Sequence, residues 1–128
     1  MLRMNALAVL MVAIAGLSSA EAKTVEPVKI VKTQNGRVLA DPKGMTLYTF
    51  DKDHMGRSEC TLLCAAVWPP LMATKGQKPS DAWTLVKRAN GSMQWAYKGR
   101  PLYTYRVDMK PGDISGEGVE GEWHIAKP

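Results

Sequence analysis

The sequence contains one segment twice, and this internal repeat limits the folds open to the chain more than any other feature. When the chain is shifted by 55 positions against itself, residues 31–53 align without a gap with residues 86–108, and 10 of the 23 aligned pairs are identical. The same shift pairs Trp68 with Trp123. We expect two copies of one supersecondary unit packed together, because a single copy could not bury its own apolar face.

Each copy carries the signals of β-strands. Alternating segments flank an Asn-Gly turn at Asn35 in the first copy and at Asn90 in the second. Asn-Gly favours a tight hairpin in which both turn residues have positive φ. A further turn follows at Gly44 and Gly99, before a strand rich in aromatic residues. The sequence therefore predicts a mainly β fold of two homologous antiparallel β-meander units packed as one small domain.

The copies differ after this third strand. In the first copy, "GRSECTLLCAAVWPPL" predicts a short helix that Ser58 caps, that runs through Cys64 to Val67, and that ends before two prolines. The second copy has instead a loop rich in glycine and acidic residues, followed by a final strand over residues 123–126. We expect function to reside where the copies diverge.

The N-terminus has the layout of an export signal. Arg3 precedes an apolar run over residues 6–17 and a group of small residues. The run is shorter than the roughly 20 apolar residues of a spanning helix. We predict a signal peptide over residues 1–22, cleaved near Ala20 or Ala22, and no membrane span in the mature chain. Residues 23–128 would form a single β domain with repeats at about 28–71 and 83–126, soluble in the periplasm or secreted.

Composition restricts the classes of partner. The chain has 128 residues, of which 45% are hydrophobic and 23% charged, as expected of one globular domain. The net charge of +5 could favour anionic surfaces, but the basic residues are interleaved with acidic ones along the sequence. We expect no nucleic-acid partner, and envelope components are the partners that export would bring near.

These motifs together resemble a known family. The pattern Y-x-[FWY]-x-x-D occurs twice, and its residues are Tyr48, Phe50, Asp53, Tyr103, Tyr105 and Asp108. With "QWAYKGRPLYTY" and "GEWHIAKP", the chain from about residue 31 to residue 128 resembles the bacterial secreted-repeat family of unknown function, predicted lipoproteins with a conserved Yx(FWY)xxD motif. The resemblance implies no established activity. The chain departs from the lipoprotein label, because no cysteine stands directly after either predicted cleavage site.

The two cysteines are the residues of the sequence with the most reactive side chains. Cys60 and Cys64 have C-x3-C spacing in a chain predicted to be exported, where a disulfide is the expected state. Closing so small a loop would stabilise the fold by about 2 kcal/mol. Two alternatives remain open: a redox-active pair, and a copper site in which His54 joins the two thiolates.

The acidic loop suggests calcium. Asp113, Ser115 and Glu117 fall at the first, third and fifth positions of a calcium-loop pattern, with a glycine at the sixth. The twelfth position, which should be a bidentate Glu, is His124. A solvated acidic turn is the interpretation that we prefer.

No catalytic constellation is recognisable. Asp53 and Asp108 could form an acid/base pair, but each stands where a strand gives way to a turn, and an Asp there accepts backbone N–H bonds. Trp83, Trp95 and Tyr97 could line a binding face or pack the core. We therefore predict an exported, non-enzymatic small β protein without a cofactor, acting as an envelope or periplasmic binding or structural module. The alternative is a copper-handling or thiol-redox protein that uses Cys60 and Cys64.

Overall fold

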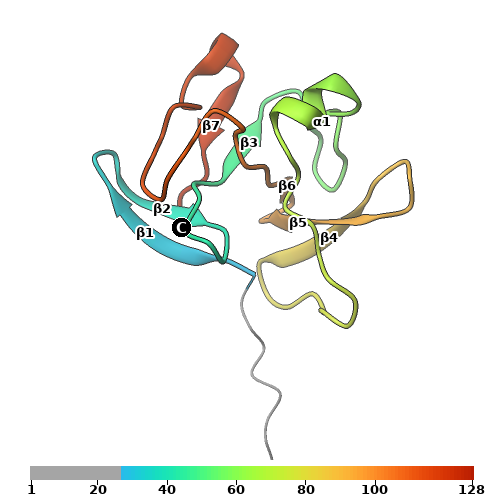
Figure 1. Cartoon of the computed structure of the whole chain (residues 1–128). Helices are drawn as coiled ribbons and strands as arrows, with labels where there is room; N and C mark the ends of the chain where they lie inside the picture. The colour runs from blue at the N-terminus through green and yellow to red at the C-terminus, as the bar shows by residue number, and fades with distance from the viewer. Residues whose placement is uncertain (1–26) are drawn as a thin grey trace, which may run out of the picture.

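The structure is a computed structural model, and it describes residues 27–128 (Figure 1). The predicted signal peptide and its cleavage sites lie outside the described residues. In the described part, no helix has the length and apolar character needed to cross a bilayer. The elements in chain order are β1 (Lys29–Thr33), β2 (Gly36–Ala40), β3 (Tyr48–Phe50), α1 (Leu63–Val67), β4 (Trp83–Lys87), β5 (Met93–Tyr97), β6 (Arg100–Pro101), the 3₁₀ helix η1 (Val119–Gly121) and β7 (Trp123–Ile125).

The strands form three small antiparallel sheets, β1–β2, β3–β7 and β4–β5–β6. The second repeat contains a three-stranded meander, but its third strand is Arg100–Pro101. The prediction that the motif segment over residues 102–105 forms this strand is wrong, because Tyr103 makes only isolated bridges. In the first repeat, β3 pairs with β7 of the second repeat. The segment before β3 meets β2 at the bridge between Ala40 and Thr46, which the hydrogen bonds from Leu47 N to Leu39 O and from Asp41 N to Met45 O flank. The mainly β fold of two repeats with one short helix is confirmed, and the two repeats exchange strands.

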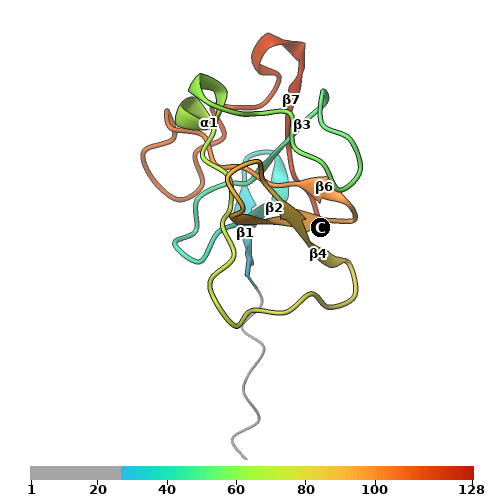
Figure 2. The same ribbon diagram turned by 90° about the vertical axis from the view of Figure 1, so that its right-hand side faces the viewer.

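A pseudo-twofold axis passes between the motif segments of the two repeats, which are β3 and the segment that follows β6. Tyr48 and Tyr103 face each other as an antiparallel pair, with N–H···O=C distances of 2.8 and 3.0 Å between their backbones. Outside this pair, Ile125 of the second repeat flanks Tyr48, and Pro70 of the first repeat flanks Tyr103. Each repeat therefore sends its last segment across to the other (Figure 2).

A ring of three backbone hydrogen bonds closes each half of the molecule. In one ring, Leu47 N donates to Leu39 O (2.9 Å), Leu39 N to Ala126 O (2.9 Å) and Ala126 N to Leu47 O (2.8 Å). The matching ring joins Leu102, Trp95 and Leu71 through bonds of 3.0, 2.8 and 2.9 Å. Because one member of each ring comes from the other repeat, neither repeat can close by itself.

The two Asn-Gly turns differ in one respect from the prediction. Gly36 and Gly91 have φ of +86° and +84°, but neither Asn35 nor Asn90 is among the positive-φ residues of the described chain. The expectation of positive φ at both turn residues is wrong. The glycine alone supplies the left-handed conformation, as in a type I turn followed by a glycine bulge.

The helix α1 begins later than the sequence suggests. Its N-cap is Leu62, without a side-chain cap, so the prediction that Ser58 caps the helix is wrong. The Ser58 hydroxyl lies 2.7 Å from the Tyr103 hydroxyl and is used in the interior instead. The helix ends at Val67 with Trp68 as its C-cap, and the two prolines that follow prevent its continuation.

The interior is mostly aromatic. The larger cluster surrounds the pseudo-twofold axis and contains Tyr48, Tyr103, Trp68 and Trp123, all of them buried. A second, aliphatic cluster lies between the two hairpins, and Trp83 and Tyr97 pack against it while remaining half-buried. Most of the aromatic residues therefore form the core, as expected of a chain with a single phenylalanine.

Candidate functional site

The repeated motif makes its hydrogen bonds between the repeats, not within them. The Tyr48 hydroxyl donates to Asp108 Oδ2 at 2.5 Å, and the Tyr103 hydroxyl donates to Asp53 Oδ2 at 2.6 Å. Each copy thus supplies a tyrosine to the other copy's aspartate. We call these two reciprocal tyrosine–aspartate hydrogen bonds across the pseudo-twofold axis the locks.

The second oxygen of each aspartate shapes the loop that follows it. Asp53 Oδ1 accepts the backbone N–H of Glu59 at 2.7 Å, and Asp108 Oδ1 accepts that of Ser115 at 2.9 Å. These contacts give the aspartates the turn-building role that their position suggests. Both oxygens of each carboxylate have partners, and the structure presents neither of them as a free acid or base.

Burial keeps the two tyrosines protonated. It is the largest cause that raises the pKa of Tyr48 and of Tyr103 above 10.0, and the hydrogen bond to the partner aspartate raises each further. Burial also raises the pKa of Asp53, against the opposing effects of the Glu59 N–H and the Tyr103 hydroxyl. The tyrosines therefore remain hydrogen-bond donors throughout the physiological pH range.

The aromatic residues near the motif form a column of four rings. Phe50 stacks on Trp123 at 4.3 Å, Trp123 on Trp68 at 3.8 Å, and Trp68 on Tyr105 at 3.9 Å between ring centroids. The two tryptophans are nearly parallel, with an interplanar angle of 2°. The column alternates between the repeats, and its two end rings, Phe50 and Tyr105, stand at the third position of the two motif copies.

The motif therefore builds the frame of the protein rather than a surface. Tyr48 and Tyr103 are wholly buried, and Asp108 is 7% exposed. Residues so placed cannot contact a large ligand. The segments in which the repeats differ are the better candidates for a functional site.

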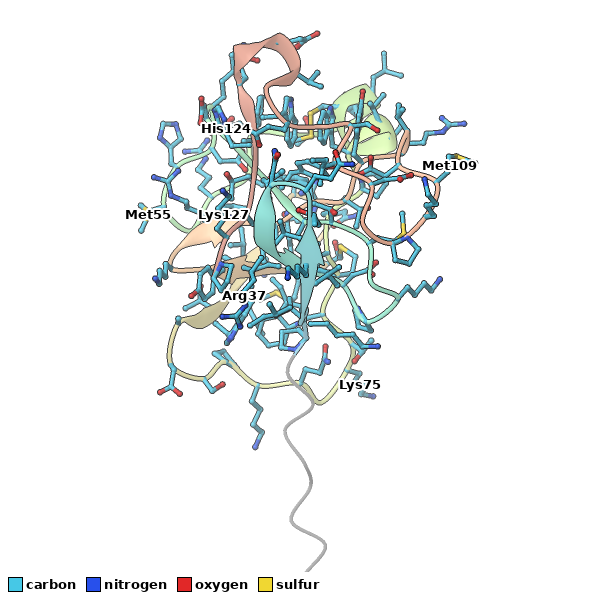
Figure 3. All side chains as sticks on the ribbon, turned by 90° about the vertical axis from the view of Figure 1, so that its left-hand side faces the viewer. Arg37, Met55, Lys75, Met109, His124 and Lys127 are labelled. Atoms are coloured by element: carbon cyan, nitrogen blue, oxygen red, sulfur yellow. A yellow bond between two sulfur atoms is a disulfide. The ribbon has the colours of Figure 1, made fainter. Side chains whose placement is uncertain are left out.

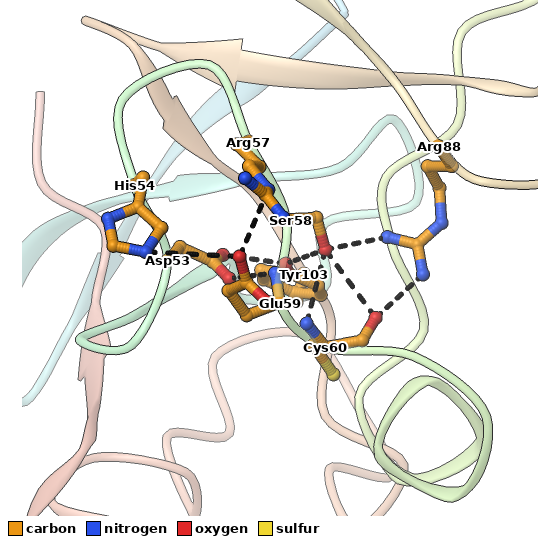
Figure 4. A network of polar contacts seen from close by, with 8 residues as sticks. All are labelled: Asp53, His54, Arg57, Ser58, Glu59, Cys60, Arg88 and Tyr103. Atoms are coloured by element: carbon orange, nitrogen blue, oxygen red, sulfur yellow. Dashed lines mark hydrogen bonds and ion pairs between the residues drawn. The ribbon is translucent and has the colours of Figure 1, made fainter.

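Arg88 organises the segment that carries the disulfide, as Figure 4 shows. Its Nη1 donates to Ser58 Oγ at 3.0 Å and to Gln94 Oε1 at 2.7 Å, and its Nη2 donates to the Cys60 carbonyl at 2.7 Å. None of the sequence motifs includes Arg88. The sequence nevertheless marks this position as a difference between the repeats, because the 55-residue shift aligns Arg88 with Thr33.

The cysteines form a disulfide next to the aromatic column. Their sulfur atoms are 2.04 Å apart and their α-carbons 5.2 Å apart. Cys60 is wholly buried in the aromatic cluster, and Cys64 packs against that cluster from the first turn of α1. The disulfide ties α1 to the frame.

The helix held in this way exposes apolar side chains. None of its residues is buried, and Leu62 and Leu63 at its start are 88% and 84% exposed. A surface helix normally turns its apolar stripe toward the core. This helix presents leucines to the outside.

Leu62 is also held in an unfavourable backbone conformation. Its φ of 52° and ψ of −120° match the second residue of a type II′ turn, and Cys64 N donates to Thr61 O at 3.1 Å to close that turn. Glycine is preferred there, and another residue costs on the order of 1–3 kcal/mol. No burial of the Leu62 side chain offsets this cost.

A groove of about 500 Å³ runs beside these leucines, between α1 and the loop over residues 88–92. Its apolar wall includes Leu62, Ala65, Pro70 and Met72. Arg88 lines it as the only charged residue. The groove and the exposed leucines together form the candidate site, which we call the α1 groove.

The structure does not bring the three predicted copper ligands together. His54 is exposed and lies 3.8 Å from Glu59, whereas Cys60 is buried in the disulfide. Within residues 27–128, no three His, Cys, Asp or Glu side chains are grouped so as to hold a metal ion. Copper binding stays a prediction, for which non-reducing intact mass with and without Cu(I) is the measurement. Copper binding requires two free thiols and one bound Cu(I) per protein. An intact disulfide whose mass does not change when Cu(I) is added would contradict it.

The predicted calcium ligands have separate partners. Asp113 accepts the N–H groups of Met109 and Lys110 and the Lys110 ammonium group, and Glu117 Oε2 accepts the N–H of Ile125 at 2.6 Å. The exposed Ser115 uses its backbone N–H on Asp108. Calcium binding by this loop also stays a prediction.

The acidic loop instead covers one of the locks. Gly116 N donates to the Tyr48 hydroxyl at 3.2 Å, and a Cβ on Gly116 would come within 2.6 Å of the tyrosine ring. Only glycine allows so close an approach. Beside the loop, His124 bonds to Asp51 at 2.8 Å, and this contact is the main cause that raises the pKa of the imidazole.

Comparison with known proteins gives one match. A family model described as a secreted repeat of unknown function matches residues 29–72 and again residues 84–127. No curated protein and no solved structure matches the chain.

Proposed function

Because the chain belongs to the family of secreted repeats of unknown function, we propose that it is an exported, non-enzymatic binding module of the cell envelope. The repeated motif supplies its rigid frame, and the α1 groove supplies its binding surface. The occupant of the groove is an apolar segment of another envelope protein.

The observation that carries this proposal is the strained, exposed leucine at the start of α1. Leu62 is 88% exposed and holds a backbone conformation that suits glycine. Strain of this kind persists where the surrounding structure enforces it, and it clusters at ligand-binding sites. A leucine that gains nothing from the fold has its apolar surface free for a partner.

The chemistry of the groove supports an apolar occupant. Leu62, Ala65, Pro70 and Met72 offer carbon surface. The charge of Arg88 is turned inward, because its Nη1 and Nη2 atoms already donate to Ser58, Gln94 and Cys60. Apolar area removed from water contributes about 25 cal/mol per Å², which favours an apolar anchor over a polar one.

Two substitutions at Leu62 separate strain from binding. Leu62→Gly should raise the unfolding free energy by about 1 kcal/mol or more, because glycine relieves the positive φ. Leu62→Ala keeps the strain and should leave stability unchanged or slightly lower. Both variants remove the leucine side chain, so both should lose the partner. Urea unfolding measures the first effect, and equal stabilities for the two variants would contradict the strain.

Photo-crosslinking in cells tests the groove directly. A photoreactive amino acid at position 63 or 65 should give a discrete adduct with one envelope protein, and the same group at Glu120, on η1, should not. The adduct formed from position 65 should disappear when Leu63→Gln is added. Adducts that form equally from Glu120, or none from either groove position, would contradict the proposal.

A further inference from the structure

The fold gathers basic side chains that the sequence scatters. Lys32 and Arg37 are directly opposite each other in the register of β1 and β2, and both are exposed. Like charges in that position destabilise an antiparallel pair. The hydrogen bond from Leu39 N to Ala126 O places the C-terminal segment beside β2, and with it Lys127 (Figure 3).

These cations lack carboxylate partners in the described part of the chain. The Lys and Arg residues that form ion pairs there are Lys52, Arg57 and Lys110, on other loops. No ion pair among residues 27–128 involves Lys29, Lys32, Arg37 or Lys127. Because strand alternation places Lys29 on the opposite face of β1 from Lys32, we call Lys32, Arg37 and Lys127 the basic hairpin face. It stands on a different side of the molecule from α1 (Figure 1).

An apolar residue lies among the charges. Ile30 is 49% exposed, and strand alternation places it on the same face of the hairpin as Lys32 and, across the ladder, Arg37. Basic residues mixed with an exposed apolar side chain are typical of surfaces that rest on a bilayer, where the cations meet headgroup phosphates and the apolar group enters the interface.

We infer that the basic hairpin face docks the exported protein on a membrane surface rich in anionic phospholipid. Headgroup phosphates would relieve the repulsion between Lys32 and Arg37, and no acidic residue of the described chain is paired with either. The inference goes beyond the proposed binding role of the α1 groove, because it uses another surface, and either can fail alone.

The test is co-sedimentation of the exported, processed protein with vesicles. Vesicles of phosphatidylglycerol and phosphatidylcholine in equal parts should bind it, vesicles of phosphatidylcholine alone should not, and rising salt should release it. Each basic residue near such a surface is worth about fivefold in partitioning, so Lys32→Glu, which changes the charge by two, should weaken binding about 25-fold.

The same substitution should leave the fold intact or improve it. The carboxylate introduced by Lys32→Glu faces Arg37 across the strand pair, so the melting temperature should stay constant or rise while vesicle binding falls. If Lys32→Glu acted only by misfolding the protein, both the melting temperature and vesicle binding would fall.

Lys52→Glu is the matched control. It makes the same change of charge next to Glu122, away from the hairpin, and should lower vesicle binding far less than Lys32→Glu. Equal losses in the two variants would overturn the inference, since net charge alone would then explain the binding. Release by millimolar inorganic phosphate at constant ionic strength would overturn it too, by revealing a small-anion site. Leu63→Gln, which changes the α1 groove, should bind vesicles as the unaltered protein does. Loss of partner binding at the groove and loss of membrane binding can therefore be told apart.

Discussion

Replacing Trp68 with alanine is expected to lower the unfolding free energy by about 3–5 kcal/mol. Trp68 is 5% exposed and stacks on Trp123 on one face and on Tyr105 on the other, at 3.8 and 3.9 Å between ring centroids. Its loss would leave a cavity at the centre of the column and break the contact between the repeats. Since a domain of this size has a total stability of about 5–15 kcal/mol, the variant would lose a large fraction of it.

Trp83→Ala is the matched control for this effect. Trp83 is half-buried at the edge of the second cluster and forms a single tilted pair with Tyr97. Trp83→Ala should lower the unfolding free energy clearly less than Trp68→Ala does in the same urea titration. Equal costs for the two variants would show that the column has no special weight in the fold.

Raising the pH above 10 is expected to destabilise the protein steeply. In the unfolded chain tyrosines ionise near 10.0, whereas burial raises the pKa of Tyr48 and of Tyr103 in the folded state. The folded state then holds protons that the unfolded state has lost, so stability is fully present below about pH 10 and falls as pH rises above it. Each tyrosine contributes a slope of about 1.4 kcal/mol per pH unit.

Tyr48→Phe should halve that slope. It should also lower stability at neutral pH by about 1–3 kcal/mol, because the buried Asp108 Oδ2 loses its donor. Tyr103→Phe should flatten the alkaline slope in the same way through the other lock. Urea unfolding at several pH values between neutrality and pH 11 measures both effects, and an alkaline slope that neither substitution changes would show that other groups cause it.

The duplication and its strands were predictable from the sequence, but the exchange between repeats was not. Tyr48 and Tyr103 occupy the same position in the two copies, and so do Asp53 and Asp108. Identical residues give no information on whether a tyrosine bonds to the aspartate of its own copy or to that of the other. Only packing decides this, because the two motif segments meet at the axis and each tyrosine hydroxyl bonds across it.

The candidate site was predictable only in outline. The sequence indicated that the divergent segment around Cys60 and Cys64 was a candidate for function, and the structure places the groove beside this segment. The exposure and strain of Leu62 depend on a turn that no local pattern signals. The Ser58 cap failed because a serine near a helix start can equally bond inward, and here the buried Tyr103 hydroxyl is its partner.

The closing ring of the first half has a consequence for the order in which the chain folds. That ring needs Ala126, so the first hairpin cannot complete its backbone bonds before the last segment of the second repeat arrives. An exported chain that crosses a membrane with its N-terminus first would remain open until nearly all of it has passed. Strand exchange thus ties the closing of the first half to the end of the chain, and a product cut before Ala126 would leave the Leu39 N–H and the Leu47 carbonyl without these partners.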